Sequence, residues 1–261
     1  MIDWSFYVAL TYPNATVYNL SPNPSETAAQ GFDQWAGLSN HRHIQHPDLA
    51  ANFPFPSGFF AAVVFRFPIA TSESAYRYVV NECKRVLRPG GHLEISLLDL
   101  DMLNMGNRAR KAVRELKMQM QIADPTVSLK PVTDNIQRLL GRRGFENLNR
   151  CFVGVPAAGR IPGSRESNNP NTEEKDMSFS DLLKEPAQQG DEGITKMVAK
   201  VGRWWYSRCY ETVALPDGDL SKSIWNDDAL VRECEKKGTS FRLLIAYAQK
   251  PAVTVRRTVS V

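Results

Sequence analysis

The fold is decided by the stretch Lys84-Arg85-Val86-Leu87-Arg88-Pro89-Gly90-Gly91-His92-Leu93-Glu94-Ile95-Ser96. Upstream of it, apolar side chains recur at positions i, i+3, i+4 and i+7, as on one face of a helix. They are Tyr76, Val79, Val80, Cys83, Val86 and Leu87. Pro89 cannot continue a helix, and Gly90 and Gly91 adopt backbone conformations that other residues avoid. The stretch therefore predicts the end of an amphipathic helix, a turn, and a buried strand over residues 92–98.

Strands and helices alternate on both sides of this unit. The strands are short apolar or β-branched runs bounded by Pro, Gly, Asn or Ser, and the helices carry one apolar face. We expect strands over residues 15–20, 41–45, 61–67, 92–98 and 146–155, and helices over residues 3–11, 25–37, 72–89, 105–122 and 132–142. This alternation is typical of a parallel sheet covered on both faces, so the sequence predicts an α/β fold.

The composition changes after residue 155. Residues 157–175 are rich in Gly, Pro, Ser and Asn and poor in apolar side chains, which predicts a flexible loop. Apolar periodicity returns in a helix over residues 193–210, and residues 241–248 read as a final strand. We therefore divide the chain into a core over 1–155, an insertion over 156–239 (a loop over 156–176 and helices over about 177–237), a last core strand over 240–251, and a tail over 252–261.

The bulk composition is that of a globular protein. The chain has 261 residues, of which 43% are hydrophobic and 23% charged, and its net charge of +4 does not predict nucleic-acid binding. The four cysteines show no C-x-x-C spacing, and neither a secretory signal nor a run of 18 apolar residues is present. We expect an intracellular protein, cytoplasmic or nuclear, with no transmembrane segment. The oligomeric state is not predicted.

The helix–Pro-Gly-Gly–strand unit resembles the class I S-adenosylmethionine-dependent methyltransferases, of the small-molecule "type 11" kind. There, "L-x-P-G-G-x-L" joins the fourth helix to the fifth strand. Phe53-Pro54-Phe55-Pro56 resembles the "L-P-F-P" loop of the family, and residues 241–251 resemble its last strand with a "K-P" exit. The resemblance implies a Rossmann-like sheet, mostly parallel, with an antiparallel last strand beside residues 146–155. It also implies a helical insertion before that last strand.

The resemblance implies S-adenosylmethionine as the cofactor and identifies residues near it. Asn19 stands where the family has an acidic residue that binds the ribose hydroxyls, and an amide can still bond a hydroxyl. Asp48 resembles the aspartate that meets the adenine amino group, and Asp3 lies near the methionine end. The implied cofactor-binding set is Asp3, Asn19, Ser21, Asp48, Leu49, Phe65 and Arg66.

Candidate acceptor residues follow the strands and the insertion. Ligands of open α/β sheets bind at the carboxyl ends of strands, where Phe67, Asp99 and Asp101 are expected; for Asp101 a helix N-cap is the favoured alternative. Trp204 and Trp205 form either a lid over an aromatic or lipid-like acceptor or a simple packing face. No general base is identified. His41-x-His43-x-x-His46 lacks further ligands at metal-binding spacing, so no metal site is predicted.

The largest departure from the family is at the front of the sequence. The family's first strand ends in a glycine-rich loop, typically "D-x-G-x-G-x-G", whereas this sequence begins Met1-Ile2-Asp3-Trp4. We therefore expect a sheet without the family's first strand. A truncated chain, a pseudoenzyme, and a site completed by a partner chain or by rearrangement all stay open. Two functions follow: methyl transfer to a small-molecule acceptor, or a non-catalytic scaffold that binds a protein partner through the Trp-rich insertion.

Overall fold

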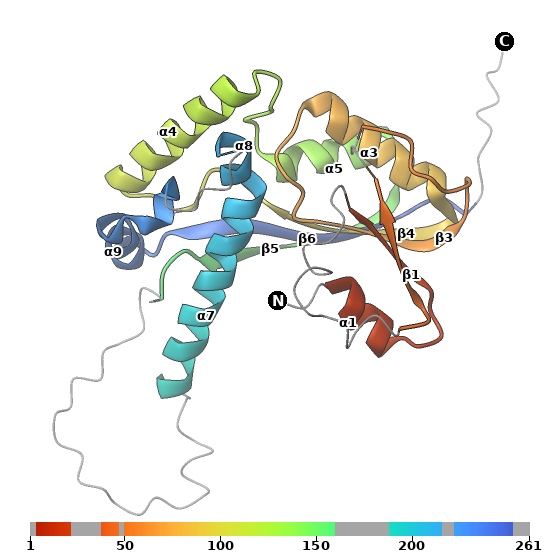
Figure 1. Ribbon diagram of the computed structural model, residues 1–261, viewed down its shortest axis with the longest axis horizontal. Helices are drawn as coiled ribbons and strands as arrows, with labels where there is room; N and C mark the ends of the chain where they lie inside the picture. Colours follow the sequence, from red (N-terminus) through yellow and green to blue (C-terminus); the bar gives the residue numbers. More distant parts are fainter. Residues whose placement is uncertain (1–3, 22–37, 47–49, 160–187, 216–221, 253–261) are drawn as a thin grey trace, which may run out of the picture.

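The computed structural model describes residues 4–21, 38–46, 50–159, 188–215 and 222–252. It is an α/β fold in which helices pack on both sides of a mixed sheet (Figure 1). The helices are α1 (Trp4–Thr11), α3 (Glu73–Val86), α4 (Asn107–Ala123), α5 (Val132–Arg142), α7 (Gln188–Tyr206), α8 (Thr212–Ala214) and α9 (Asp228–Lys237), with a π-helical turn η1 (Ser207–Glu211) and a 3₁₀ turn η3 (Ile224–Asn226). The strands are β1 (Val17–Ser21), β2 (His41–Gln45), β3 (Phe60–Arg66), β4 (Leu87–Leu98), β5 (Glu146–Pro156) and β6 (Ser240–Gln249).

The strands of the described residues form two sheets. β1 pairs in parallel with β2, and β3, β4, β6 and β5 follow one another in a four-stranded sheet. β3 and β4 are parallel, while β6 runs antiparallel to both β4 and β5. The antiparallel last strand and its predicted partner over residues 146–155 are therefore confirmed. β6 lies between β4 and β5 although it follows both in the sequence.

The structure confirms the predicted helix and strand around residues 84–96, but the predicted helix end at Pro89 and the predicted turn after it are wrong. The Ser72 hydroxyl accepts a hydrogen bond from the Ala75 amide (3.2 Å) and caps α3, as expected. The helix ends at Val86, before the proline, and the chain is extended from Leu87 onward, so Pro89 and the glycines lie within β4. Gly90 has φ +75°, and a Cβ on Gly91 would lie 2.9 Å from a backbone oxygen, so both positions require glycine.

One face of the four-stranded sheet is covered by α3 and α5. Leu93, Ile95 and Leu97 of β4 point to this side and are at most 1% exposed. They pack with the apolar faces of the two helices, which both lie on the same side of the sheet in Figure 1. Burial of these side chains provides the main stabilisation of this half of the molecule, at about 25 cal/mol for each Å² of apolar surface removed from water.

On the other face α7 packs against β5 near Val155, whereas Ile245 and Tyr247 of β6 are 44% and 49% exposed. α4 packs with α8 and α9 in a second core cluster. Tyr206, Phe241 and Leu98 lie in this second core cluster. Gly202 lets α7 approach the sheet, because a Cβ there would lie 2.9 Å from a Val155 methyl and 3.2 Å from the Phe241 ring. The predicted helix over 193–210 is present as α7 and η1, and the predicted strands over 240–251 and 146–155 are present as β6 and β5.

Some expectations fall on residues that are not described. They are the helix over 25–37, most of the loop over 156–176, the first part of the helical region from 177, and the tail from 253 onward. Where the described part touches them, Ala157 and Ala158 are buried (0% and 3% exposed).

The β1–β2 pair contacts the larger sheet through aromatic side chains. The ring of Tyr18 on β1 lies edge-on to the rings of Phe55, Phe59 and Phe60, with centroids 5.5–5.9 Å apart. Edge-to-face aromatic pairs contribute roughly 0.5–1.5 kcal/mol each beyond the area they bury. Side-chain packing, rather than a backbone ladder among the described residues, therefore joins β1 to the start of β3.

Candidate functional site

The candidate site lies at the carboxyl ends of the parallel strands, where open α/β sheets bind their ligands. β1 ends at Ser21, β2 at Gln45 and β3 at Arg66. β4 pairs in parallel with β3 as far as Ser96 and ends at Leu98. Of the predicted residues, Ser21, Phe65 and Arg66 lie at the ends of β1 and β3, and Asn19 lies in the middle of β1. Asp3, Asp48 and Leu49 lie outside the described residues.

The exit of β3 is built from stacked side chains. The guanidinium of Arg66 lies 4.8 Å from the ring centre of Trp4 on α1 and 5.7 Å from that of Phe67. Phe67 in turn stacks on Trp205 of α7, with ring centres 4.2 Å apart and planes 14° from parallel. Cation–π contacts of this kind contribute roughly 0.5–2 kcal/mol. The predicted residues Arg66, Phe67 and Trp205 are thus brought together, and Trp4 is added to them.

The backbone at Phe67 is strained. Its φ of 45° is in the left-handed region, which is uncommon for a bulky side chain. Its amide donates to the Ser96 carbonyl (2.8 Å), and the Ala70 amide donates to the Cys209 carbonyl (2.7 Å). Strained residues of this kind persist only when the surrounding contacts fix them, and they cluster at functional sites.

The carbonyl that holds Ala70 belongs to the π-helical turn η1. A π turn changes the backbone hydrogen-bond pattern of a helix and often marks a functional site. Next to it, Tyr206 donates its hydroxyl to the Leu100 carbonyl (2.9 Å) and Tyr210 donates to the Leu98 carbonyl. Burial raises the pKa of both phenols well above the ordinary value, so both stay protonated donors. These bonds fix the end of α7 to the carboxyl end of β4.

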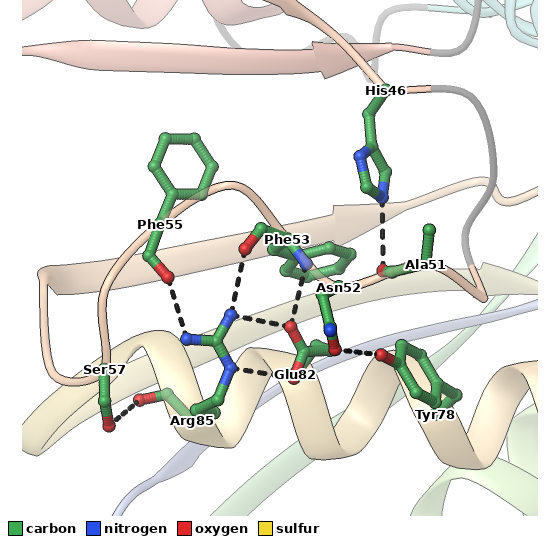
Figure 2. Close-up of polar contacts among 9 residues, drawn as sticks. All are labelled: His46, Ala51, Asn52, Phe53, Phe55, Ser57, Tyr78, Glu82 and Arg85. Atoms are coloured by element: carbon green, nitrogen blue, oxygen red, sulfur yellow. Dashed lines mark hydrogen bonds and ion pairs between the residues drawn. The ribbon is translucent and has the colours of Figure 1, made fainter.

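The loop that follows the predicted adenine-binding residue is held on α3 by an ion pair (Figure 2). Arg85 donates to both carboxylate oxygens of Glu82, at 2.8 and 2.7 Å. The same guanidinium donates to the carbonyl oxygens of Phe55 (2.8 Å) and Phe53 (3.0 Å). The Phe53 amide donates to Glu82 (2.8 Å). One buried carboxylate and one guanidinium therefore satisfy three backbone groups of the loop.

Further contacts complete this arrangement. Tyr78 donates its hydroxyl to the side chain of Asn52, and His46 contacts the Ala51 carbonyl through Nε2 (3.2 Å). The hydrogen bonds from Arg85 lower the pKa of the Glu82 carboxyl, against the opposing effect of burial. Glu82 is 6% exposed, which makes this pair better shielded from solvent than a surface ion pair. Figure 2 shows that all these groups converge on the loop from α3 and from the end of β2.

The two aspartates predicted after β4 have different surroundings. Asp99 is 2% exposed, and its carboxylate accepts from the Thr133 amide (3.0 Å) and hydroxyl (2.8 Å) and from Arg242 (3.0 Å). Burial raises the pKa of Asp99, and these donors oppose that effect. Asp101 pairs with Lys117 at 2.7 Å. Asp99 thus serves the first turn of α5, and its oxygens are already engaged in this structure.

The alternative prediction, that Asp101 is the N-cap of the next helix, is wrong. α4 begins after Gly106, whose conformation is extended, and no side-chain cap is provided by that residue. Instead, Glu233 of α9 accepts hydrogen bonds from the amides of Arg108 (3.2 Å) and Ala109 (3.1 Å). The free backbone amides at the N-terminus of α4 are therefore bonded by a carboxylate from a distant segment. The spacing of residues in the sequence gives no sign of this contact.

The two tryptophans of the insertion point to different environments. Trp205 is half-buried on Phe67, whereas Trp204 is 42% exposed and lies beside Arg208, whose guanidinium is 5.5 Å from its ring. Trp205 therefore packs on the site in this structure, and Trp204 faces solvent.

The histidines are used in packing. His41 stacks on Phe6 of α1, with ring centres 4.0 Å apart, and its Nε2 lies 2.9 Å from the Ser5 hydroxyl. Within the described ranges, no three His, Cys, Asp or Glu side chains form a metal-binding group. No helix in the same part of the chain is both long and apolar enough to cross a membrane.

Comparison with known families gives a match in the first part of the sequence. Residues 5–95 match the family model described as a methyltransferase domain. The predicted resemblance to class I methyltransferases is confirmed. The matched methyltransferase-like segment runs from α1 to the middle of β4, so it includes the exits of β1, β2 and β3 and the loop in Figure 2. No curated protein matches the chain.

Solved structures of methyltransferases are similar at low identity. A phosphoethanolamine N-methyltransferase 2 of Haemonchus contortus, solved with S-adenosylmethionine, has 14% identity and a TM-score of 0.48, over 94% of this chain and 45% of that one. A SAM-dependent methyltransferase of Methanosarcina mazei has 12% identity and a TM-score of 0.46, over 95% and 87%. With TM-scores below 0.5, neither structure enters the functional argument, which rests on the family match.

Sequence reasoning missed the Glu82–Arg85 pair. The two residues stand three apart, a spacing at which side chains on a helix meet. Glu82 also lies beside Cys83, within the apolar face of α3, where an acidic side chain is unusual unless it is paired. These two signals together indicate a charged residue with a defined partner.

Proposed function

We propose that this chain binds S-adenosylmethionine and transfers its methyl group to a small-molecule acceptor. The observation that carries the proposal is the family match over residues 5–95, which includes the strand exits at the carboxyl edge. When bound, the cofactor supplies an electrophilic methyl group on a sulfonium. Catalysis of such a transfer consists largely of positioning the acceptor in line with that methyl group.

The donor set at the β3 exit fits one part of the cofactor. Arg66 is half-buried and forms no salt bridge with any residue in the described ranges. The rings of Trp4 and Phe67 hold its guanidinium in place, so little side-chain freedom is lost on binding. A preorganised guanidinium of this kind suits a carboxylate, and S-adenosylmethionine carries one on its methionine part. In this proposal Arg66 binds that carboxylate, and Phe65 lies along the cofactor.

The remaining predicted residues take the following roles in this proposal. Asn19 and Ser21 bind the ribose, Asp48 with Leu49 contacts the adenine, and Asp3 lies near the methionine end. The Glu82–Arg85 pair positions the loop after Asp48 and is not itself in contact with the cofactor. Phe67 and Trp205 form the acceptor wall. Asp99, Asp101 and Trp204 are the outer candidates for acceptor contact, and no general base is assigned.

Calorimetric titration with S-adenosylhomocysteine tests the proposal, because this product analogue needs no acceptor. We expect binding in the unmodified chain and a loss of about 10- to 100-fold in affinity for Arg66→Ala, the range for one charge-assisted hydrogen bond. Arg77→Ala is the matched control, because Arg77 is exposed on α3. The proposal is refuted if the titration shows no heat of binding up to millimolar ligand while circular dichroism shows that the protein is folded.

A non-catalytic scaffold is the second candidate function. The observation that favours it is the exposure of apolar side chains along α7. Ile194, Met197 and Val198 are 62%, 68% and 39% exposed, and Trp204 extends this surface. Two results together support this function over methyl transfer. The chain does not bind the cofactor, and it captures a protein partner whose binding is lost in Trp204→Ala.

A further inference from the structure

β3 and β5 form the two edges of the four-stranded sheet, and the edge formed by β5 is the longer one. β5 is the last strand in the sheet order and pairs with β6 on its inner side. Its residues 146–154 are all exposed. Of the described elements, α7 also packs on β5, and its Gly202 meets the strand at Val155, near the far end. Long exposed edge strands pair with other strands unless prolines, lysines or a covering segment prevent it.

The hydrogen-bond pattern decides which groups of β5 face outward. The amide of Ala157 donates to the Thr239 carbonyl of the β6 side (2.9 Å). Bonded and non-bonded pairs alternate along an antiparallel ladder, so the odd-numbered residues from 149 to 155 bond to β6. The bonds between β4 and β6 give the same phase. The N–H and C=O groups of Arg150, Phe152 and Gly154 therefore point outward.

We propose that β5 pairs antiparallel with β5 of a second copy of this chain, about a two-fold axis at Cys151. Such a pair is isologous, because the same residues are used in both copies, and it joins the two sheets into one. In this register Arg150 of each copy faces Phe152 of the other, and both residues have outward-pointing backbone groups. Each of these facing pairs exchanges two backbone hydrogen bonds.

Side-chain chemistry selects this register over its neighbours. A two-fold axis at Arg150 would place two arginines directly opposite each other, which is unfavourable. An axis at Phe152 would place each Arg150 opposite a glycine. With the axis at Cys151, each guanidinium meets an aromatic ring that is 42% exposed. The ring is already a cation–π acceptor, because Arg242 from the inner strand lies 4.3 Å from its centre.

The axis also places the two Cys151 side chains opposite each other. Cys151 is in a non-bonded pair of the new ladder, where Cα atoms are about 4.5 Å apart. This lies within the range of Cα separations that a disulfide spans, so the thiol is a reporter of the register. The other three cysteines, Cys83, Cys209 and Cys234, are buried. Oxidation can therefore link two copies only through Cys151 if the chain stays folded.

The test uses the full chain. Under reducing conditions, sedimentation velocity is expected to show a monomer that becomes a dimer with rising micromolar concentration, since a single edge makes a small interface. Treatment with diamide is expected to give a covalent dimer on a non-reducing gel, lost in Cys151→Ser. In the Cys151→Ser background, Val153→Cys places a thiol on the same face but out of register. It should crosslink at least ten-fold more slowly.

Phe152→Pro removes an outward N–H group and leaves the inner ladder intact, so it should abolish the dimer. Arg150→Glu, which keeps all backbone groups, is the second variant and should weaken the dimer at least several-fold. Near-ultraviolet circular dichroism verifies that both remain folded. A monomer at every concentration, or equal crosslinking by Cys151 and Val153→Cys, overturns the proposal. Both readouts are independent of cofactor binding.

Discussion

The contact of α7 with the sheet can be tested with one methyl group. Gly202 and Gly193 both lie within α7. A Cβ on Gly202 would meet a Val155 methyl at 2.9 Å and the Phe241 ring at 3.2 Å, and both partners are at most 5% exposed. A Cβ on Gly193 would meet nothing within 4 Å. The same substitution therefore probes packing at one position and helix propensity alone at the other.

The expected magnitudes have opposite signs. Replacing a helical glycine by alanine stabilises by about 1 kcal/mol, so Gly193→Ala should raise the free energy of unfolding by that amount. At Gly202 the same gain is opposed by overpacking of a buried contact, which costs about 1–3 kcal/mol. Since neither neighbour is the end of a long flexible chain, we expect a net loss of about 1 kcal/mol. The two variants should then differ by about 2 kcal/mol.

Urea unfolding followed by far-ultraviolet circular dichroism measures both variants against the unmodified chain. A difference of this size corresponds to a separation of roughly 4–8 °C in melting temperature. If Gly202→Ala is as stabilising as Gly193→Ala, α7 does not rest on β5 and β6 as described. In that case the packing of Trp205 on Phe67 is also called into question, and the result favours the interpretation of Trp205 as part of a lid.

Three further predictions use single contacts. Glu82→Gln should lower the free energy of unfolding by about 1–3 kcal/mol at neutral pH, as expected for loss of a charge-assisted hydrogen bond. Because the pKa of Glu82 is lowered in the folded state, this difference is present above the unfolded-state pKa and should vanish as the pH falls through the folded-state pKa; urea unfolding at a series of acidic pH values measures it. Gly106→Ala would place a Cβ 2.2 Å from the Glu233 carboxylate, so it should displace that cap and cost about 1 kcal/mol by thermal unfolding. Tyr206→Phe leaves a buried carbonyl without its donor and should cost about 1–3 kcal/mol, whereas Tyr7→Phe at an exposed position should be neutral.

Local patterns predicted much of the core. The helix over 132–142 and the strand over 41–45 have the predicted bounds, and Ser72 caps α3 as expected. Apolar periodicity and capping are properties of neighbouring residues, so a single sequence contains them. The end of α3 was predicted too late, because Pro89 disfavours the helical conformation only from Arg88 onward and does not show that Leu87 is already extended.

The candidate site was predictable only where it follows strand ends. Arg66 and Phe67 were expected there, but the contact of Arg66 with Trp4 joins residues that are far apart in the sequence. The segment after β3 is fixed by two hydrogen bonds to distant parts of the chain, from the left-handed Phe67 to Ser96 and from Ala70 to Cys209 in the π turn. Such features arise from tertiary packing and leave no local periodicity to detect.

The position of β6 in the sheet has a consequence for synthesis of the chain on the ribosome. β4 and β5 are both made before β6, yet in the sheet β6 lies between them. Until residues 240–249 emerge, neither strand has its β6 partner, and the apolar side chains that β6 contributes to both cores are missing. Pairings between such distant segments form slowly. A nascent chain stalled before residue 240 therefore exposes apolar surface and unpaired strand edges, so it should depend on chaperones. A chain released after β6 has been made should not depend on them.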